Sequence, residues 1–407
     1  MKIKLPEYKE IRNINELPLE TLILLFGYVN RMNTASYWLV NHSLVCHLWT
    51  DKVIPAAWSE LSLSTNQPPD PLVQYNERRI IAHSAGGDRV LFRKLIMRIG
   101  KSVDYISALM TVTSVDLRNN PSTNNVIDRL ADALKSNTNI TSISFYNNRL
   151  MQKGGTTICN ALQKNTTLTH LDLGLNMLGA NGGNAVGGVA FAKALSANRA
   201  LNTLVLNNNT FSKETLVALG DMLASNSSLT DLGLANNSIT ADSASALFER
   251  LAASNNRSLI RIDLSNNLVG VEGGESIASN ISRCNICELL LSNNQLSTTG
   301  SMSILKSLPS SIQTIDVSNN AITPTQLASD TLVTLLQKND TLTKLNISSN
   351  KLDDDVVQPL IQSIQSNKSL IHIQIGSNQF SKQSNNKLVD CFRNNKSIFF
   401  YDLQEEY

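Results

Sequence analysis

Apolar and polar residues alternate in one frame that recurs along most of the chain. From Leu168 to Leu178 the sequence reads Leu-Thr-His-Leu-Asp-Leu-Gly-Leu-Asn-Met-Leu. The same frame returns nine more times, and its Asn falls at positions 120, 148, 176, 209, 237, 267, 294, 320, 350 and 378. Neighbouring copies are 26 to 33 residues apart. A fixed period of this length is the signature of a repeat architecture.

Each copy predicts a short strand, a turn and a helix. Leu171 and Leu173 alternate with Asp172, so the two leucines point to one face of a strand and Asp172 to the other. After each frame Asn, apolar residues recur at helical spacing, as in Leu332-Val333-Thr-Leu335-Leu336. The repeating unit is therefore strand, turn and helix.

Two sets of Asn residues recur in the unit, one after the strand and one at the end of the helix. The frame Asn stands where the chain leaves the strand, and its amide can satisfy backbone groups that no neighbouring strand reaches. Ten copies at one position predict a buried structural ladder rather than a catalytic group. A second Asn often precedes the next strand, as in Asn226-Ser-Ser-Leu229, because Asn tolerates the conformation that closes a helix.

The frame Leu-x-x-Leu-x-Leu-x-x-Asn-x-Leu resembles the leucine-rich repeats of the ribonuclease-inhibitor-like class. The resemblance implies an α/β solenoid shaped as a horseshoe, with parallel strands on the concave side and helices on the convex side. We expect it to occupy residues 58–407, regular over 111–380 and closed by a C-terminal cap at 381–407. Residues 67–110 are irregular: Phe92–Met97 is either a degenerate repeat, or residues 75–110 are mainly helical.

Residues 1–57 do not follow the repeat. They contain Leu17-Pro18-Leu-Glu20, then Phe26-Gly-Tyr28, then Val45-Cys46-His-Leu-Trp49, with Trp58 before the first strand frame. These marks, in this order, resemble an F-box, although the spacing from Phe26 to Cys46 is longer than usual in that family. The resemblance implies docking on Skp1 through Leu17, Pro18, Leu22, Leu25, Phe26, Tyr28, Val45 and Trp49. The alternative is a helical cap over the solenoid core.

Composition bears on the kind of partner and on the cellular compartment that we expect for this protein. The formal charge is +2 and 17% of residues are charged, which does not suggest nucleic acid or a membrane surface as partner. No apolar run approaches the roughly 18 residues of a membrane span, and the first residues do not resemble a signal peptide. Five scattered cysteines fit a reducing compartment. We expect a cytoplasmic protein that is monomeric on its own.

Candidate chemistry is sparse. Cys284 and Cys287 form a lone Cys-x-x-Cys pair, whereas a zinc site needs about four ligands. The five His residues are dispersed, and adjacent repeats supply no Ser/His/Asp set. We therefore expect no catalytic site, no metal and no cofactor.

The remaining candidate is the concave face. The residue between the two strand leucines points into it, and flanking polar residues extend the column. We expect a protein partner of basic or mixed polarity to contact Asp116, Tyr146, His170, Asp172, Arg261, Asp263, Glu288, Asp316, Lys344 and His372. Because Leu-Asp-Leu is common in this repeat class, some of these Asp residues also fit a consensus role without a partner.

Together the two resemblances imply a non-catalytic, substrate-recruiting adaptor of an SCF-type (Skp1–cullin–F-box) ubiquitin ligase. The Asn- and Ser-rich composition and the loosened F-box also resemble eukaryote-like effectors of intracellular bacteria such as Legionella, which would place the protein in the host cytosol. The alternatives are a protein-binding scaffold or inhibitor with a helical cap, and then a GTPase activator resembling the Ran activator. That last family usually carries a long acidic tail and has no F-box-like start.

Overall fold

The computed structural model describes residues 60–62, 94–96, 113–119, 124–179 and 186–403. The chain forms two compact units, Met1–Leu117 and Arg118–Tyr407. The F-box-like segment and its predicted Skp1 contacts lie outside the described residues.

The first unit contributes three short strands, β1 (Glu60–Ser62), β2 (Lys94–Ile96) and β3 (Ser114–Asp116). They pair in parallel, with Leu61 opposite Leu95 and Leu95 opposite Val115. β1 lies in the frame that follows Trp58, and β2 lies inside the degenerate frame Phe92–Met97. Lys94–Ile96 thus forms a strand at the place where the degenerate frame predicts one.

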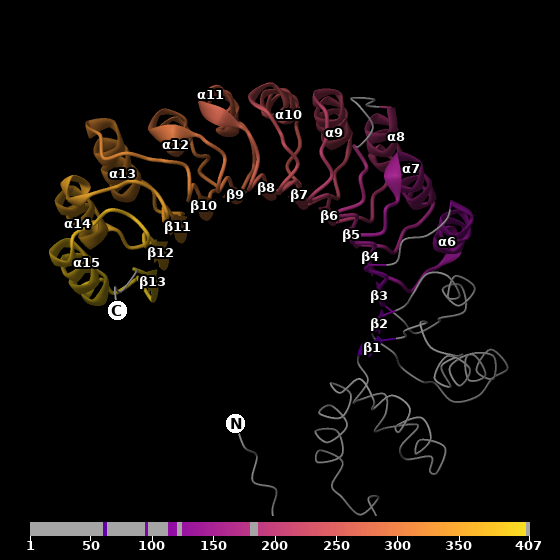
Figure 1. The fold of residues 1–407 in the computed structure, drawn as a ribbon, viewed down its shortest axis with the longest axis horizontal. Coiled ribbons are helices and arrows are strands. Elements are labelled where there is room, and N and C mark those ends of the chain that lie inside the picture. The colour runs from indigo at the N-terminus through magenta and orange to yellow at the C-terminus, as the bar shows by residue number, and fades with distance from the viewer. Residues whose placement is uncertain (1–59, 63–93, 97–112, 120–123, 180–185, 404–407) are drawn as a thin grey trace, which may run out of the picture. The chain divides into compact units, whose positions relative to one another are not determined.

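The second unit alternates helix and strand throughout. Its elements are α6 (Asn124–Ser136), β4 (Ser142–Ser144), α7 (Met151–Leu162), β5 (His170–Asp172), α8 (Val186–Ser196), β6 (Thr203–Val205), α9 (Lys213–Ser225), β7 (Asp231–Gly233), α10 (Ala241–Ala253), β8 (Arg261–Asp263), α11 (Gly270–Ile281), β9 (Glu288–Leu290), α12 (Ser297–Lys306), β10 (Thr314–Asp316), α13 (Gln326–Lys338), β11 (Lys344–Asn346), the 3-10 turn η3 (Asp354–Val356), α14 (Val357–Ser366), β12 (His372–Gln374), α15 (Lys382–Asn394) and β13 (Phe400–Asp402). From β4 to β13 each strand pairs in parallel with the next in the chain. Within this unit the strands line the inner side of an arc and the helices its outer side (Figure 1). The predicted leucine-rich-repeat solenoid is confirmed.

Burial follows the predicted alternation. In β5, Leu171 is fully buried while His170 and Asp172 are half-buried, and the following Leu173 is again buried. The helices turn a second apolar row against these leucines, as Leu216, Leu219 and Leu223 do from α9. The core is thus a continuous layer between sheet and helices, and each repeat fills it only together with its neighbours.

The frame Asn residues form the predicted ladder. Asn267 donates through Nδ2 to the carbonyl oxygens of Leu264 (2.7 Å) in its own repeat and Leu234 (3.0 Å) in the preceding one. Its Oδ1 accepts the backbone N–H groups of Asn237 (2.9 Å) and Ile239 (3.0 Å). With a longer bond from Nδ2 to the Ser265 carbonyl (3.3 Å), one buried amide therefore satisfies five backbone groups across two repeats.

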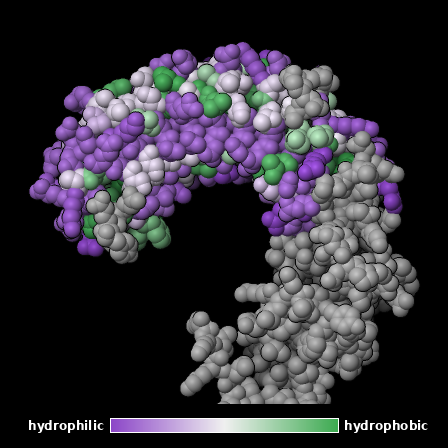
Figure 2. Space-filling model, in the orientation of Figure 1, coloured by the Kyte–Doolittle hydropathy of each residue, from purple (hydrophilic) through white to green (hydrophobic). Residues whose placement is uncertain are grey.

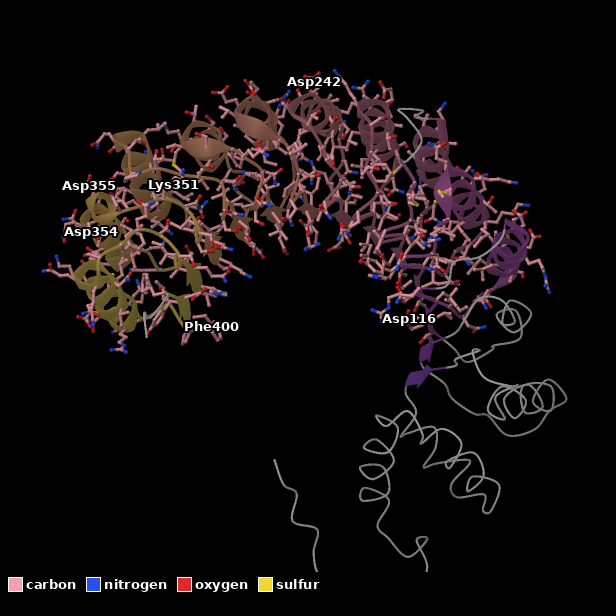
Figure 3. All side chains as sticks on the ribbon, viewed as in Figure 1. Asp116, Asp242, Lys351, Asp354, Asp355 and Phe400 are labelled. Carbon is pink, nitrogen blue, oxygen red and sulfur yellow. The ribbon has the colours of Figure 1, made fainter. Side chains whose placement is uncertain are left out.

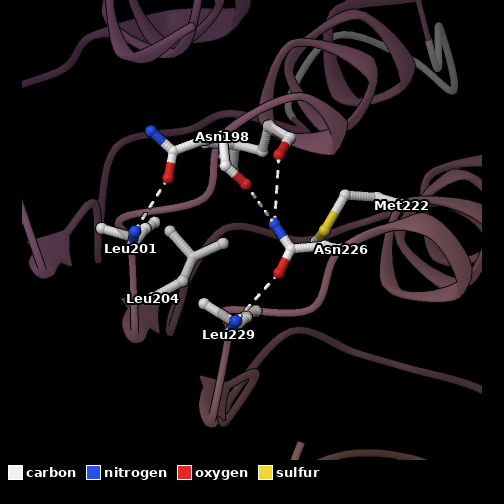
Figure 4. Close-up of a pocket in the computed structure, with 7 residues that line it drawn as sticks. Asn198, Leu201, Leu204, Met222, Asn226 and Leu229 are labelled. Atoms are coloured by element: carbon white, nitrogen blue, oxygen red, sulfur yellow. Dashed lines mark hydrogen bonds between the residues drawn. The ribbon is translucent and has the colours of Figure 1, made fainter. Parts of the chain in front are cut away.

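A second ladder joins the helix ends. Asn226 donates through Nδ2 to the carbonyl oxygens of Leu195 (3.3 Å) and Asn198 (2.9 Å), while its Oδ1 accepts the N–H of Leu229 at 2.8 Å (Figure 4). The surrounding Leu204 and Met222 are buried. The Asn-x-Ser/Thr triplets are thus explained by structure, because the amide holds each helix end to the next strand.

Candidate functional site

The concave face is built from the two outer residues of each strand. The middle residue enters the core, so the first and third residues project to the inner side of the arc (Figure 3). Eight of the predicted contact residues occupy these positions in β5, β8, β9, β10, β11 and β12, namely His170, Asp172, Arg261, Asp263, Glu288, Asp316, Lys344 and His372. The topology therefore brings residues far apart in sequence into two adjacent rows.

The two other predicted residues differ from this set. Tyr146 follows β4 and is half-buried, and a Cβ placed on Gly174 would lie 3.0 Å from its Cδ2. The Tyr146 ring therefore lies against the backbone of the next repeat. Asp116 ends β3 in the first unit and is only 4% exposed, so it is buried more deeply than the predicted column implies.

The Asp residues in the third strand position have a structural role. Oδ1 of Asp172, Asp263 and Asp316 accepts the N–H group two residues later in the chain, at 2.9, 3.0 and 2.8 Å. This bond closes the turn after each strand. Oδ2 of Asp172 also accepts the hydroxyl of Ser144 at 2.8 Å, and that of Asp316 accepts the amide of Asn346 at 2.9 Å. The acidic column is consequently less available to a partner than its sequence suggests.

The first strand position carries the more available charges. Arg261 lies across β8 and β9, with Nε 3.0 Å from Oε1 of Glu288 and Nη2 3.7 Å from Oδ2 of Asp263. All three side chains keep between 18% and 36% of their surface exposed. The pairing fixes the Arg261 guanidinium in the middle of the concave face while leaving part of it open to a ligand.

At the last three strands, β11 to β13, the concave face carries aromatic side chains beside a histidine. The His372 ring lies 5.9 Å from the Phe400 ring, centroid to centroid. Burial and the positive charge of Lys344 lower the pKa of His372, against the opposing effect of Asp402. Phe399, Phe400 and Tyr401 are 73%, 63% and 38% exposed.

The sequence pattern did not select these aromatic residues as contacts, because residues 381–407 were predicted to be a C-terminal cap. β13 does add the strand, but all three of its residues are exposed. The signal was present in the frame: Phe400 pairs with His372 in register, so it occupies the same strand position as the predicted His170 and His372.

Of the described cysteines, Cys159, Cys284 and Cys391 are buried and Cys287 is half-buried. Burial raises the pKa of Cys159 to about 12 and that of Cys284 to about 11, so both thiols stay protonated near neutral pH. In the part of the chain that the structure describes, no three His, Cys, Asp or Glu side chains are placed to hold a metal ion. No helix of that part is long and apolar enough to cross a bilayer.

The fold and its partly exposed concave rows define the class: this is a leucine-rich-repeat protein, built on a protein-interaction scaffold. Rows of charged, imidazole and aromatic side chains on rigid strands suit recognition of another protein. More narrowly, the chain belongs to the family of the MHP1/HER1/GIP3 LRR domain, whose model matches residues 95–379.

Beyond the family, the chain is similar to several proteins of known structure. No curated protein matches the sequence. The chain is similar to the yeast complex of Rad7 and Elc1, with 14% identity, 84% of this chain and 87% of that chain covered, and a TM-score of 0.48. It is similar to the leucine-rich-repeat protein LegL7 of Legionella pneumophila, with 19% identity, coverage of 71% and 90%, and a TM-score of 0.45. It is also similar to an internalin of Listeria monocytogenes, with 16% identity, coverage of 80% of this chain and 87% of that chain, and a TM-score of 0.45.

Proposed function

We propose that the concave face recruits a protein substrate and that the F-box-like segment docks on Skp1, so that the protein is a non-catalytic adaptor of an SCF-type ubiquitin ligase. The observation that carries the recognition half is the row on the first strand position, which is half-buried at His170 and Arg261 and exposed at Phe400. The sequence marks Leu17-Pro18 and Cys46-x-x-Trp49 support the docking half.

The geometry favours a partner of mixed polarity with an apolar anchor. Arg261 and Lys344 offer donors, and Glu288 and Asp402 offer acceptors, on strands that the sheet holds in fixed register. At the C-terminal end of the arc, hydrophobic residues lie on the inner edge of an otherwise mostly hydrophilic surface (Figure 2). Exposed aromatic side chains dominate binding energy at many interfaces, so we place the hot spot at Phe399 and Phe400.

The same proposal implies the cellular compartment in which the protein works. An adaptor of this kind works where Skp1 is present, in the cytosol. If the protein is delivered by an intracellular bacterium, as its resemblance to eukaryote-like effectors implies, that compartment is the host cytosol.

Calorimetry with purified Skp1 and the full chain tests the docking half. We expect binding, with clear loss in the Pro18→Ala and Phe26→Ala variants. Arg261→Ala is the matched control, because it alters the concave face and should bind Skp1 as the parent does. Absence of Skp1 binding by the folded full chain would leave the scaffold or inhibitor interpretation and refute the adaptor.

Proximity labelling in cells tests the recognition half. The Phe400→Ala and Lys344→Ala variants should lose a set of labelled proteins that Phe26→Ala retains. The Lys193→Ala variant changes an exposed lysine on α8 and should lose none. Identical labelled sets for the concave variants and the parent protein would refute the concave face as the recognition surface.

A further inference from the structure

Both Asn ladders of the solenoid are interrupted around α12. The repeat that contains it is the shortest, with 26 residues between Asn294 and Asn320, and α12 has ten residues where α9, α10 and α13 have thirteen. Oδ1 of Asn294 and Oγ of Ser301 are buried without a hydrogen-bond partner. The irregularity is local, because the regular bonding resumes at Asn320, whose Oδ1 accepts the N–H groups of Asn294 and Leu296.

The helix-end ladder is interrupted at the same place. The position of the ladder Asn is taken by Arg283 before β9, three residues before Ile286, and by Pro309 before β10, three residues before Ile312. The Pro309 carbonyl accepts the N–H of Ile312 at 3.1 Å. Asn339, in the next repeat, therefore lacks the arrangement of carbonyl groups that its counterparts bind. Six of those counterparts donate Nδ2 to two carbonyl groups of the preceding repeat, namely Asn165, Asn198, Asn226, Asn256, Asn367 and Asn395.

Asn339 keeps only half of this bonding. Its Oδ1 accepts the N–H groups of Thr341 (3.0 Å) and Leu342 (2.6 Å), as the ladder requires. Its Nδ2 has no acceptor among the residues that the structure describes. An amide that is half-buried and retains two free protons is a donor ready for an external acceptor.

Asn339 lines an open groove of about 220 Å³ between α12 and α13. The floor is apolar, formed by the buried Leu305 and Leu335 and the half-buried Leu308. These two helices are neighbours on the outer side of the arc (Figure 1), so the groove is separate from the concave face.

The rim of the groove is positively charged. Lys306 and Lys338 end α12 and α13, are exposed, and form no ion pair within the described chain. Asp340 is the acidic residue adjacent in sequence, and it too is exposed. Around its apolar floor the groove thus offers the side-chain donors of Thr334 and Asn339 and the two cationic donors Lys306 and Lys338.

We propose that this groove binds an acidic amphipathic segment of a partner protein. Carboxylates would pair with Lys306 and Lys338, a carbonyl oxygen would accept from Nδ2 of Asn339, and an apolar side chain would cover Leu305 and Leu335. The volume lies below the roughly 300–1,000 Å³ of pockets for drug-sized ligands, which favours an anchoring side chain over a small molecule. The site is independent of the concave face and of Skp1.

The test uses the full chain and a short fluorescein-labelled peptide that alternates Glu with Leu. Fluorescence anisotropy should show saturable binding of this peptide and none of the version with Lys in place of Glu. The Lys306→Glu/Lys338→Glu double variant should weaken binding roughly tenfold or more, since charge-assisted bonds are among the stronger ones. The Thr334→Trp variant, at an exposed position that lines the groove, should abolish binding by filling it.

Two variants serve as controls. Lys193→Glu/Lys382→Glu makes the same change of charge on exposed lysines of α8 and α15, and should bind the peptide as the parent does. Arg261→Ala should also bind normally, because it lies on the concave face. Circular dichroism and thermal unfolding establish that Thr334→Trp remains folded.

Three results would overturn the proposal: no binding of the acidic peptide, equal binding of the Lys peptide, or binding that Thr334→Trp leaves intact. Binding of the full chain to vesicles containing phosphatidylserine, without binding of the peptide, would identify an anionic surface as the ligand instead and would equally refute a peptide groove.

Discussion

Replacing two Asn residues of the same ladder by Ala should have unequal effects on stability. Asn267 and Asn294 are both buried, at 3% and 0% exposure, and both donate Nδ2 to carbonyl groups of their own and the preceding repeat. Only Asn267 also accepts, from the N–H groups of Asn237 and Ile239, because Oδ1 of Asn294 has no partner. Asn267→Ala therefore strands two buried N–H groups that Asn294→Ala does not.

The size of the difference follows from those two groups. A buried donor that loses its acceptor costs about 1–3 kcal/mol. The side-chain volume removed is the same in both variants, so the cavity contribution largely cancels. Asn267→Ala should thus destabilise the protein by roughly 2–6 kcal/mol more than Asn294→Ala.

Urea unfolding followed by circular dichroism measures this difference, provided that the dependence of the free energy on urea is unchanged between variants. Because repeat arrays can unfold in parts, amide hydrogen exchange supplies a second reading. The amides of Asn237 and Ile239 should lose protection in Asn267→Ala and keep it in Asn294→Ala. Equal loss of stability together with equal protection would refute the bonding scheme of the ladder.

Further predictions concern titratable groups. Because burial raises the pKa values of Cys159 and Cys284, both should resist alkylation by iodoacetamide in the native protein while the half-buried Cys287 reacts, as mass spectrometry of the digested protein would show. His372 should titrate below 6.5 by NMR, and Lys344→Ala should raise its pKa by removing a nearby positive charge. The folded state favours neutral His372, so the contribution of this residue to stability is present above pH 6.5 and is lost as the pH falls through its lowered pKa. A His372 pKa that Lys344→Ala leaves unchanged would contradict the electrostatic effect of Lys344 on His372.

Local pattern was sufficient for the repeat itself. The alternation at Leu171, Asp172 and Leu173 predicts which residues enter the core, because a strand has a side-chain period of two whatever its neighbours are. Parallel strands in chain order are what the resemblance to leucine-rich repeats implies, and the pairing of β4 to β13 confirms them. The predicted concave residues of β5 to β12 accordingly lie where the frame places them.

The bonding of individual polar groups was not predictable in this way. Asp172 reads as one of a column of free carboxylates, yet its oxygens close a turn and accept from Ser144. Asn339 reads as one more copy of the helix-end Asn, yet its Nδ2 has no acceptor within the described residues. The bond from Ser144 to Asp172 and the missing acceptor of Asn339 both depend on an adjacent repeat, about one period away in sequence.

By itself the sequence determined the class of fold, the residues of the core and the direction of each strand side chain, because these follow from short-range periodicity and from apolar burial. Only the tertiary structure decided which charges stay available, where the aromatic corner of β13 lies open and where the groove between α12 and α13 forms. The physical reason is that hydrogen bonds and grooves arise between repeats, and one short repeat with Pro309 in place of Asn changes them without disturbing the frame.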